Sequence, residues 1–209
     1  MQLIARDLAI DRGGRRIVDR VSFTVASGEA LVLTGPNGAG KTTLIRAIAG
    51  FLPVAEGEVR LDGGTADTEI AEQSHLVGHR DGIKGAMTVA ENAGFFSRYL
   101  GSAPNGPRSG KGSGLVHSAL ERLGLAGLAD VPAAWLSAGQ RRRLGLSRLL
   151  LAERPLWLLD EPTVSLDASA VETLAGIVGE HLVRGGIVIA ATHIPLGLAD
   201  ARELRMGGA

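Results

Sequence analysis

Apolar residues alternate with polar ones in the first part of the chain and gather into short continuous runs further on. The alternation at residues 3–10 and 21–25 places apolar side chains on one face of half-buried strands. These strands are expected to form an antiparallel edge sheet. The continuous runs at 30–33, 156–159 and 187–191 predict strands that are buried on both faces.

Helical spacing fills the intervals between these runs. The pattern predicts helices near 41–50, 89–100, 115–123, 138–152 and 168–182, and a further strand and turn at 57–63. Buried strands that alternate with helices predict an α/β fold with a mainly parallel sheet wrapped by helices.

One domain is expected over residues 1–209, with a helical subdomain at about 85–150. Within that subdomain, residues 101–114 read as a flexible linker, because they are rich in glycine, serine and proline.

Composition limits the classes of partner. With 22 Lys and Arg against 22 Asp and Glu, the net charge is +0, so no global field attracts nucleic acid. The chain has no Cys, which excludes disulfides and thiolate ligands. It also lacks a signal-peptide pattern and any apolar run near the roughly 18 residues that span a bilayer. If the protein works on a membrane, another component holds it there.

The strongest chemical motif is G-P-N-G-A-G-K-T at residues 35–42, directly after the run 30–33. Its glycines allow the backbone N–H groups to point at phosphates, while Lys41 adds a cation and the Thr42 hydroxyl suits Mg²⁺. A chance glycine-rich turn is the alternative, but the motif is complete and lies between a strand and a helix. The candidate ligands of a nucleoside triphosphate are Gly35, Pro36, Asn37, Gly38, Ala39, Gly40, Lys41, Thr42 and Thr43.

Two carboxylates follow the apolar run 156–159. Asp160 suits the Mg²⁺ side of the site, and Glu161 is placed to orient or deprotonate an attacking water. These residues could instead end a strand as solvated charges, but the presence of Lys41 favours catalysis.

The pentapeptide L-S-A-G-Q at 136–140 reads either as an ordinary helix start or as a second anion site. Ser137 is a good N-cap in both interpretations. Together with the phosphate loop, this pentapeptide resembles the signature of the ATP-binding cassette (ABC) proteins, which implies the fold of an ABC nucleotide-binding domain.

The ABC resemblance implies a homodimer in the ATP-bound state. In such dimers, two domains pack head to tail, and the signature of one domain closes over the γ-phosphate that the other domain holds. Ser137, Gly139 and Gln140 would then contact nucleotide. Asp167 matches the D-loop and also reads as a helix N-cap, and His193 matches the histidine that contacts the γ-phosphate.

Within the ABC proteins, the chain resembles the ATP-binding subunits of the bacterial haem exporters of cytochrome c biogenesis. The resemblance rests on the stretches 78–84, 87–92, 136–143 and 155–162. It implies ATP and Mg²⁺ as cofactors and integral membrane subunits as partners at the cytoplasmic face of the inner membrane. It also implies that hydrolysis drives haem export or the release of a haem-loaded chaperone.

Two positions depart from the general ABC pattern. His79 stands where most members carry the Q-loop glutamine, and Gln73 lies too far upstream to replace it. Arg12 stands where an aromatic residue usually stacks on adenine, so its guanidinium is the candidate for stacking.

Other basic residues and the histidines give no sign of further ligands. Arg141, Arg142 and Arg143 are expected to form a solvated face rather than a nucleic-acid patch. The five histidines show no axial-ligand context, so no haem site is predicted.

Other classes of protein fit the sequence less well. A generic ABC exporter with another cargo is one alternative, and the stretch 78–84 argues against it by resemblance. A soluble ABC protein of nucleic-acid metabolism usually carries long coiled-coil insertions or two cassettes. A nucleotide kinase or a GTPase has no reason to carry the signature pentapeptide.

Overall fold

The computed structural model describes residues 1–78, 80–101, 112–192, 198 and 200–207, and the chain divides into two compact units. We call residues 1–78, 154–162 and 175–209 the sheet unit, and residues 79–153 and 163–174 the helical unit. The chain therefore crosses between the units four times, at 78/79, 153/154, 162/163 and 174/175.

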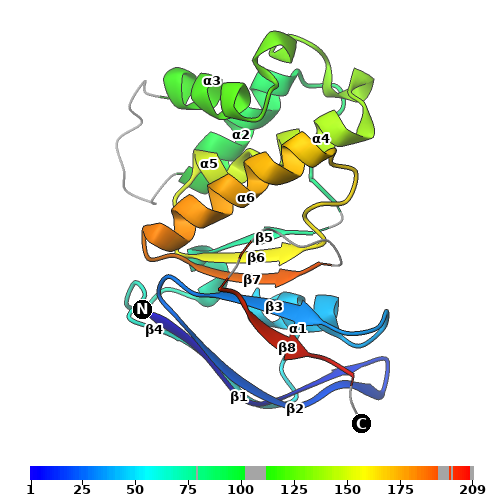
Figure 1. Ribbon diagram of the computed structural model, residues 1–209, viewed down its shortest axis with the longest axis vertical. Coiled ribbons are helices and arrows are strands. Elements are labelled where there is room, and N and C mark those ends of the chain that lie inside the picture. Colours follow the sequence, from blue (N-terminus) through cyan, green and yellow to red (C-terminus); the bar gives the residue numbers. More distant parts are fainter. Residues whose placement is uncertain (79, 102–111, 193–197, 199, 208–209) are drawn as a thin grey trace. The chain divides into compact units, whose positions relative to one another are not determined.

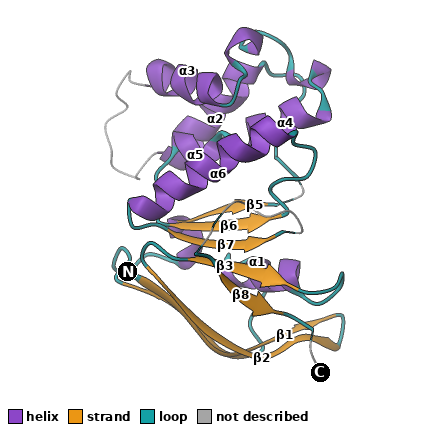
Figure 2. Ribbon diagram, in the orientation of Figure 1, coloured by secondary structure: helices purple, strands orange, loops and turns teal. Residues whose placement is uncertain are grey.

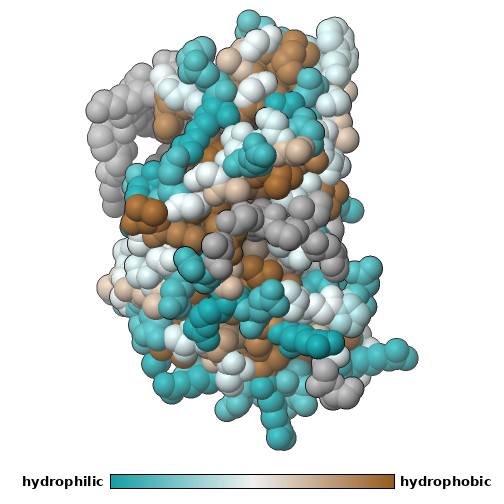
Figure 3. All heavy atoms as spheres, in the orientation of Figure 1, coloured by the Kyte–Doolittle hydropathy of each residue, from teal (hydrophilic) through white to brown (hydrophobic). Residues whose placement is uncertain are grey.

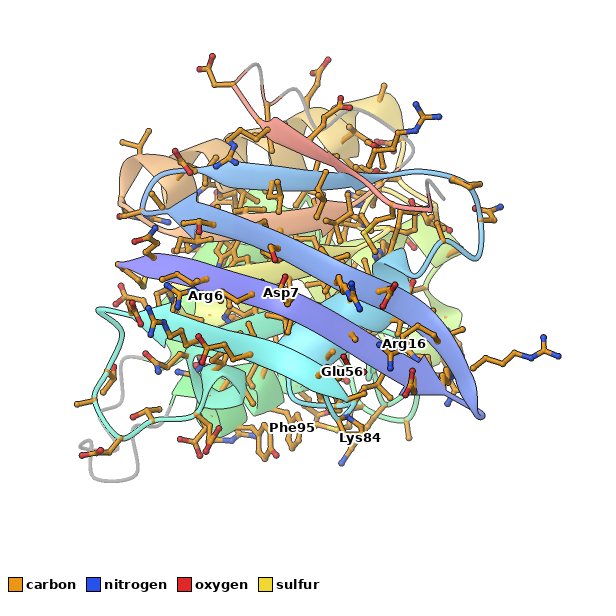
Figure 4. The ribbon with its side chains drawn as sticks, turned by 90° about the horizontal axis from the view of Figure 1, so that it is seen from below. Arg6, Asp7, Arg16, Glu56, Lys84 and Phe95 are labelled. Carbon is orange, nitrogen blue, oxygen red and sulfur yellow. The ribbon has the colours of Figure 1, made fainter. Side chains whose placement is uncertain are left out.

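The sheet unit contains a three-stranded antiparallel sheet in the order β2-β1-β4. Its strands are β1 (Gln2–Arg12), β2 (Arg15–Ala26) and β4 (Glu56–Asp62). Charged residues lie on the outer face, where Arg16 pairs with Asp11 and Glu56 at 2.7 Å each (Figure 4). Hydrophilic side chains predominate over this sheet in Figure 3. The alternating pattern therefore predicted the sheet correctly.

The second sheet of this unit has five parallel strands in the order β5-β6-β7-β3-β8 (Figure 1). The strands are β3 (Ala30–Thr34), β5 (Ser74–Val77), β6 (Leu156–Asp160), β7 (Ile187–Ala191) and β8 (Arg202–Arg205). Every residue of β6 and β7 is buried, which confirms that the continuous apolar runs are interior strands.

Helix α1 (Lys41–Ile48) contacts both sheets and lies between them in Figure 1. Leu44, Ile45 and Ile48 are fully or almost fully buried in this core. The short 3₁₀ helix η1 (Ile70–Gln73) precedes β5. The predicted α/β class with a parallel core and an antiparallel sheet is confirmed.

The other helices are α2 (Val89–Gly101), α3 (Gly112–Arg122), α4 (Ala138–Leu146), α5 (Arg148–Leu151) and α6 (Ala168–Val183), with 3₁₀ turns η2 (Ala126–Leu128) and η3 (Ala133–Trp135) (Figure 2). All belong to the helical unit except the second half of α6. Within the described ranges, no helix combines the length and the apolar character needed to cross a bilayer.

Two expectations in the helical unit were wrong in detail. The helix expected at 138–152 is interrupted at Ser147, whose hydroxyl donates to the Leu144 carbonyl at 2.7 Å. The expected linker at 101–114 is wrong at its two ends, because Gly101 belongs to α2 and residues 112–114 belong to α3. Residues 102–111 lie outside the described residues.

The second half of α6 carries a buried histidine onto the parallel sheet. The ring of His181 stacks on the indole of Trp157 in β6, with centroids 3.8 Å apart and planes 7° from parallel. Among the described residues, neither His181 Nε2 nor Trp157 Nε1 has a hydrogen-bond partner. Burial lowers the pKa of His181 to about 4, so the imidazole is neutral at physiological pH.

Candidate nucleotide site

The loop at residues 35–40 joins β3 to α1, so both ends of the loop are anchored in the buried core. Gly35 and Gly40 have positive φ angles of 129° and 95°. A β-carbon at Gly40 would lie 3.0 Å from the Ile17 carbonyl oxygen, and one at Gly35 would collide with the Met206 backbone. The loop therefore depends on glycine both for its conformation and for its close approach to neighbouring strands.

Lys41 is the first residue of α1 and is only 8% exposed. Its ammonium group donates to the carbonyl oxygens of Gly35 at 2.7 Å and Pro36 at 3.0 Å. An ammonium has three donors, so two of them hold the loop and one remains for an oxygen of an anion.

The N-terminus of α1 adds further donors to this region. In the described structure, no side chain caps this helix and no acidic residue occupies its first turn. The first N–H groups and the helix dipole therefore favour an anion beside Lys41. This arrangement suits the phosphates of a nucleotide.

Thr42 and Asp160 bring two oxygen atoms that could bind a metal together at the carboxyl end of β6. The Thr42 hydroxyl donates to Asp160 Oδ1 at 2.9 Å, and Asp160 is 2% exposed. Hydroxyl and carboxylate oxygens are the donors that Mg²⁺ prefers, so this pair fits the metal. No group of three or more His, Cys, Asp and Glu residues that could hold a metal occurs in the described ranges.

Glu161 has an unusual backbone conformation. Its φ angle is +50°, in the left-handed region that non-glycine residues rarely adopt, and its N–H donates to the Ala191 carbonyl at 2.8 Å. This bond to the end of β7 holds the strained residue beside Asp160 and Thr42 in the sheet unit. Backbone strain of this kind clusters at functional sites, which supports a special task for Glu161.

The signature pentapeptide begins α4 in the helical unit. Ser137 is the N-cap: Gln140 N–H donates to its hydroxyl at 3.2 Å, and Ser137 N–H donates to Gln140 Oε1 at 2.9 Å. The helix-start interpretation is therefore correct as local structure. A β-carbon at Gly139 would lie 2.8 Å from the Ser165 carbonyl oxygen, a contact that the sequence did not predict.

Asp167 is the N-cap of α6, since Ala170 N–H donates to its carboxylate at 2.8 Å. The same segment provides the Ser165 carbonyl that approaches Gly139. The signature and the candidate D-loop thus contact each other within one unit, and Gly139 is the residue that allows the approach.

The expectation of a solvated arginine face on α4 was wrong. Arg142 is 5% exposed and pairs with Asp81 at 2.7 Å. Arg141 donates to the Ala133 carbonyl at 3.1 Å, and Arg143 donates to the Leu123 carbonyl at 3.0 Å. The guanidinium groups of Arg141, Arg142 and Arg143 bind partners 8, 61 and 20 residues away in the sequence, and local charge patterning does not reveal these partners.

The remaining candidates are placed less fully. His79 and His193 lie outside the described residues. Arg12 is exposed and faces Arg15 across the β1–β2 turn. Gln73 is buried and binds the backbone of Thr65 and Thr68, which gives it a structural role.

The phosphate loop, its helix and the Thr42–Asp160 pair together define a P-loop domain that binds a nucleoside triphosphate. The family profile described as ABC transporter matches residues 18–164 of the chain.

Two relatives, each described as "Cytochrome c biogenesis ATP-binding export protein CcmA", match over the full length. The protein of Rhodopseudomonas palustris is 50% identical, with 100% of each chain covered. That of Rhizobium meliloti is 51% identical, with 100% of this chain and 99% of the relative covered.

Solved structures show the same fold. An ABC transporter ATP-binding protein from Pyrococcus furiosus superimposes with a TM-score of 0.81 at 24% identity, covering 99% of this chain and 98% of the other. An ATP-binding cassette of an ABC transporter in its ADP conformation gives 0.78 at 26% identity, covering 99% and 87%.

The chain therefore belongs to the ABC transporter family and, within it, to the cytochrome c biogenesis ATP-binding export proteins. Proteins of this class bind ATP and hydrolyse it, so the chain is an ATPase. The resemblance seen in the phosphate loop, the signature and the stretch 78–84 is confirmed.

Proposed function

We propose that the chain is the ATP-hydrolysing subunit of a membrane export complex in cytochrome c biogenesis. It works on integral membrane subunits at the cytoplasmic face of the bacterial inner membrane, where hydrolysis drives haem export or frees a haem-loaded chaperone. The full-length identity of about half to the named export proteins carries this proposal. The chain itself hydrolyses ATP and binds neither haem nor nucleic acid.

The phosphates lie on the loop and the α1 N-terminus, at residues 35–43. Lys41 uses its third donor on a phosphate oxygen, and Thr42 and Asp160 hold Mg²⁺, which supplies charge neutralisation for the phosphates when it is bound. Arg12 stacks on the base with its guanidinium plane.

Glu161 orients or deprotonates the attacking water. The fixed backbone of this residue supports that role, because it limits the directions in which the carboxylate can point. His193 contacts the γ-phosphate, and His79 replaces the Q-loop glutamine.

A second copy of the chain completes each site in the ATP-bound state. The α4 N-terminus, with Ser137, Gly139 and Gln140, closes over the γ-phosphate held by the partner, and Asp167 links the two sites. Each copy acts as a single ATPase domain over residues 1–209, with the helical subdomain at about 85–150. The uncapped donors of α1 and the contact of Gly139 with the candidate D-loop support this arrangement.

The test is covalent haem in membrane c-type cytochromes of a deletion strain. Rescue with the wild-type gene is compared with rescue by Glu161→Gln, and Glu172→Gln, at an exposed position of α6, is the matched control. We expect only Glu161→Gln to lose covalent haem, with b-type haem unchanged. Normal covalent haem in all three strains would refute the role in cytochrome c biogenesis and point to an exporter of another cargo.

A further inference from the structure

Within the stretch 78–84, the proposed function gives a task to His79 alone, yet Asp81 in the same stretch is tightly held. Arg142 Nη1 lies 2.7 Å from Asp81 Oδ1, and the two side chains are 5% and 16% exposed. Arg148, in α5, donates to the backbone carbonyl of the same residue. We call Asp81, Arg142 and Arg148 the charged clasp.

Helix α4 has a glycine at the point where Asp81 packs against it. A β-carbon at Gly145 of α4 would lie 2.6 Å from Asp81 Oδ1 and 2.7 Å from its β-carbon, so only glycine lets Asp81 lie this close. Arg148 also donates to the Gly145 carbonyl at 2.8 Å and covers the ring of Phe96 at 4.6 Å. The charged clasp thus packs against Gly145 of α4 and Phe96 of α2.

Asp81 places a negative charge beside the buried Arg142 and the half-buried Arg148. Burial lowers the pKa of Arg148, the nearby charge of Asp81 opposes this effect, and the charge of Arg142 adds to it. Without the carboxylate, the repulsion between the charges of Arg142 and Arg148 would no longer be opposed by the charge of Asp81. The position of Asp81 and the position of α4 therefore depend on each other.

The other end of the same segment is also fixed. Lys84 N–H donates to Asn92 Oδ1 at 2.9 Å, and Asn92 Nδ2 donates to the Lys84 carbonyl at 3.0 Å. The Lys84 ammonium lies 4.8 Å from the centroid of the Phe95 ring (Figure 4). Residues 81–84 therefore connect α4 and α5 to α2, directly after the chain enters the helical unit.

From these contacts we infer that Asp81 is a positioning residue for the signature. Its clasp fixes α4 against the segment 81–84, and so sets the position of Ser137 and Gly139 for the ATP of the second copy. This inference rests on the proposed head-to-tail dimer. It assigns a physical task to Asp81 in the stretch 78–84.

The test uses the purified full chain with Asp81→Asn, which keeps the size that Gly145 accommodates but removes the charge. The measurements are kcat and KM for ATP, the Kd of a fluorescent ATP analogue, and ATP-dependent dimerisation in the Glu161→Gln background. Leu120→Ala, at a buried position of α3, is the control for general destabilisation of the helical unit. Arg142→Gln and the double variant complete a mutant cycle.

We expect Asp81→Asn to lower kcat by about tenfold or more, because small misplacements of a catalytic group cost this much. Dimerisation should weaken by a similar factor. The analogue should keep its Kd, since the phosphate loop lies in the sheet unit. Arg142→Gln should match this pattern, and the double variant should lose no more than either single variant.

Unchanged turnover in folded Asp81→Asn protein would overturn the inference. An equal loss in Leu120→Ala, compared at the same distance below each melting temperature, would also overturn it, because the clasp would then be merely structural. The proposed function would be refuted, and the inference with it, if the wild-type chain did not hydrolyse ATP and the Glu161→Gln variant did not dimerise with ATP. The first two results leave the proposed function intact.

Discussion

Acid should destabilise the sheet unit through His181, and this prediction follows directly from the structure. The pKa of His181 is lowered to about 4 by burial, whereas the unfolded chain has an ordinary value near 6.5. Between these two pH values, the imidazole of His181 therefore binds a proton in the unfolded chain but stays neutral in the folded chain. The stability that His181 contributes is complete above pH 6.5 and is lost as the pH falls toward 4.

The size of the effect comes from the two pKa values. A shift from 6.5 to about 4 corresponds to about 3 kcal/mol, and about 2 kcal/mol remains after solvent screening is allowed for. His181→Leu removes the titrating group and has nearly the same volume. Because the other titrating groups are common to both proteins, they cancel in the difference between wild type and variant.

The assay is urea unfolding of both proteins from pH 7.5 to pH 4, followed by tryptophan emission. Trp157 reports on the site directly, since its indole stacks on the His181 ring. We expect the wild type to lose about 2 kcal/mol more than the variant between pH 6.5 and 4. If the unfolding free energies of the two proteins changed equally with pH, the conclusion that His181 is buried and neutral would be refuted.

Three further predictions concern the nucleotide site and the signature. Lys41→Ala should weaken ATP binding by about 100-fold or more, because a charge-assisted contact is lost, and calorimetry that shows normal affinity would contradict the loop assignment. Thr42→Ala should bind ATP equally with Mg²⁺ and with EDTA, whereas wild type should bind more tightly with Mg²⁺; an unchanged Mg²⁺ dependence would exclude the Thr42–Asp160 pair as the metal site. Gly139→Ala should lower the unfolding free energy by about 1–3 kcal/mol, since its methyl group would meet the Ser165 carbonyl, and Ala138→Gly is the matched control in thermal unfolding. Equal melting temperatures for wild type and Gly139→Ala would disprove the close contact.

The elements that the sequence predicted well are those whose burial shows in the hydrophobicity of a few consecutive residues. The runs in β3, β6 and β7 have no polar residue at their centres, so their interior position was evident. Strands β5 and β8 were not predicted. The four residues of β8 read R-E-L-R, and its place beside β3 depends on backbone pairing across more than half the chain. Periodicity cannot reveal such a strand.

The same limit applies to the site. The motifs located Lys41, Thr42, Asp160 and Glu161, because each stands at a fixed place beside a strand. Their partners were harder to foresee: the bond between Glu161 and Ala191 spans 30 residues, and the pair of Arg142 with Asp81 spans 61. Three consecutive arginines look alike in sequence, yet only one of them is in the clasp.

The strand order has a consequence for how the chain folds during synthesis. Strand β3 leaves the ribosome early, but in the described structure its neighbours are β7 and β8, which begin at residues 187 and 202. The centre of the sheet therefore cannot form until nearly the whole chain has been made. Until then, the apolar strand β3 stays without its partners while the helical segment 80–153 can already collapse. A nascent chain stalled near residue 160 should depend on chaperones, and cells that lack them should accumulate aggregates of this length.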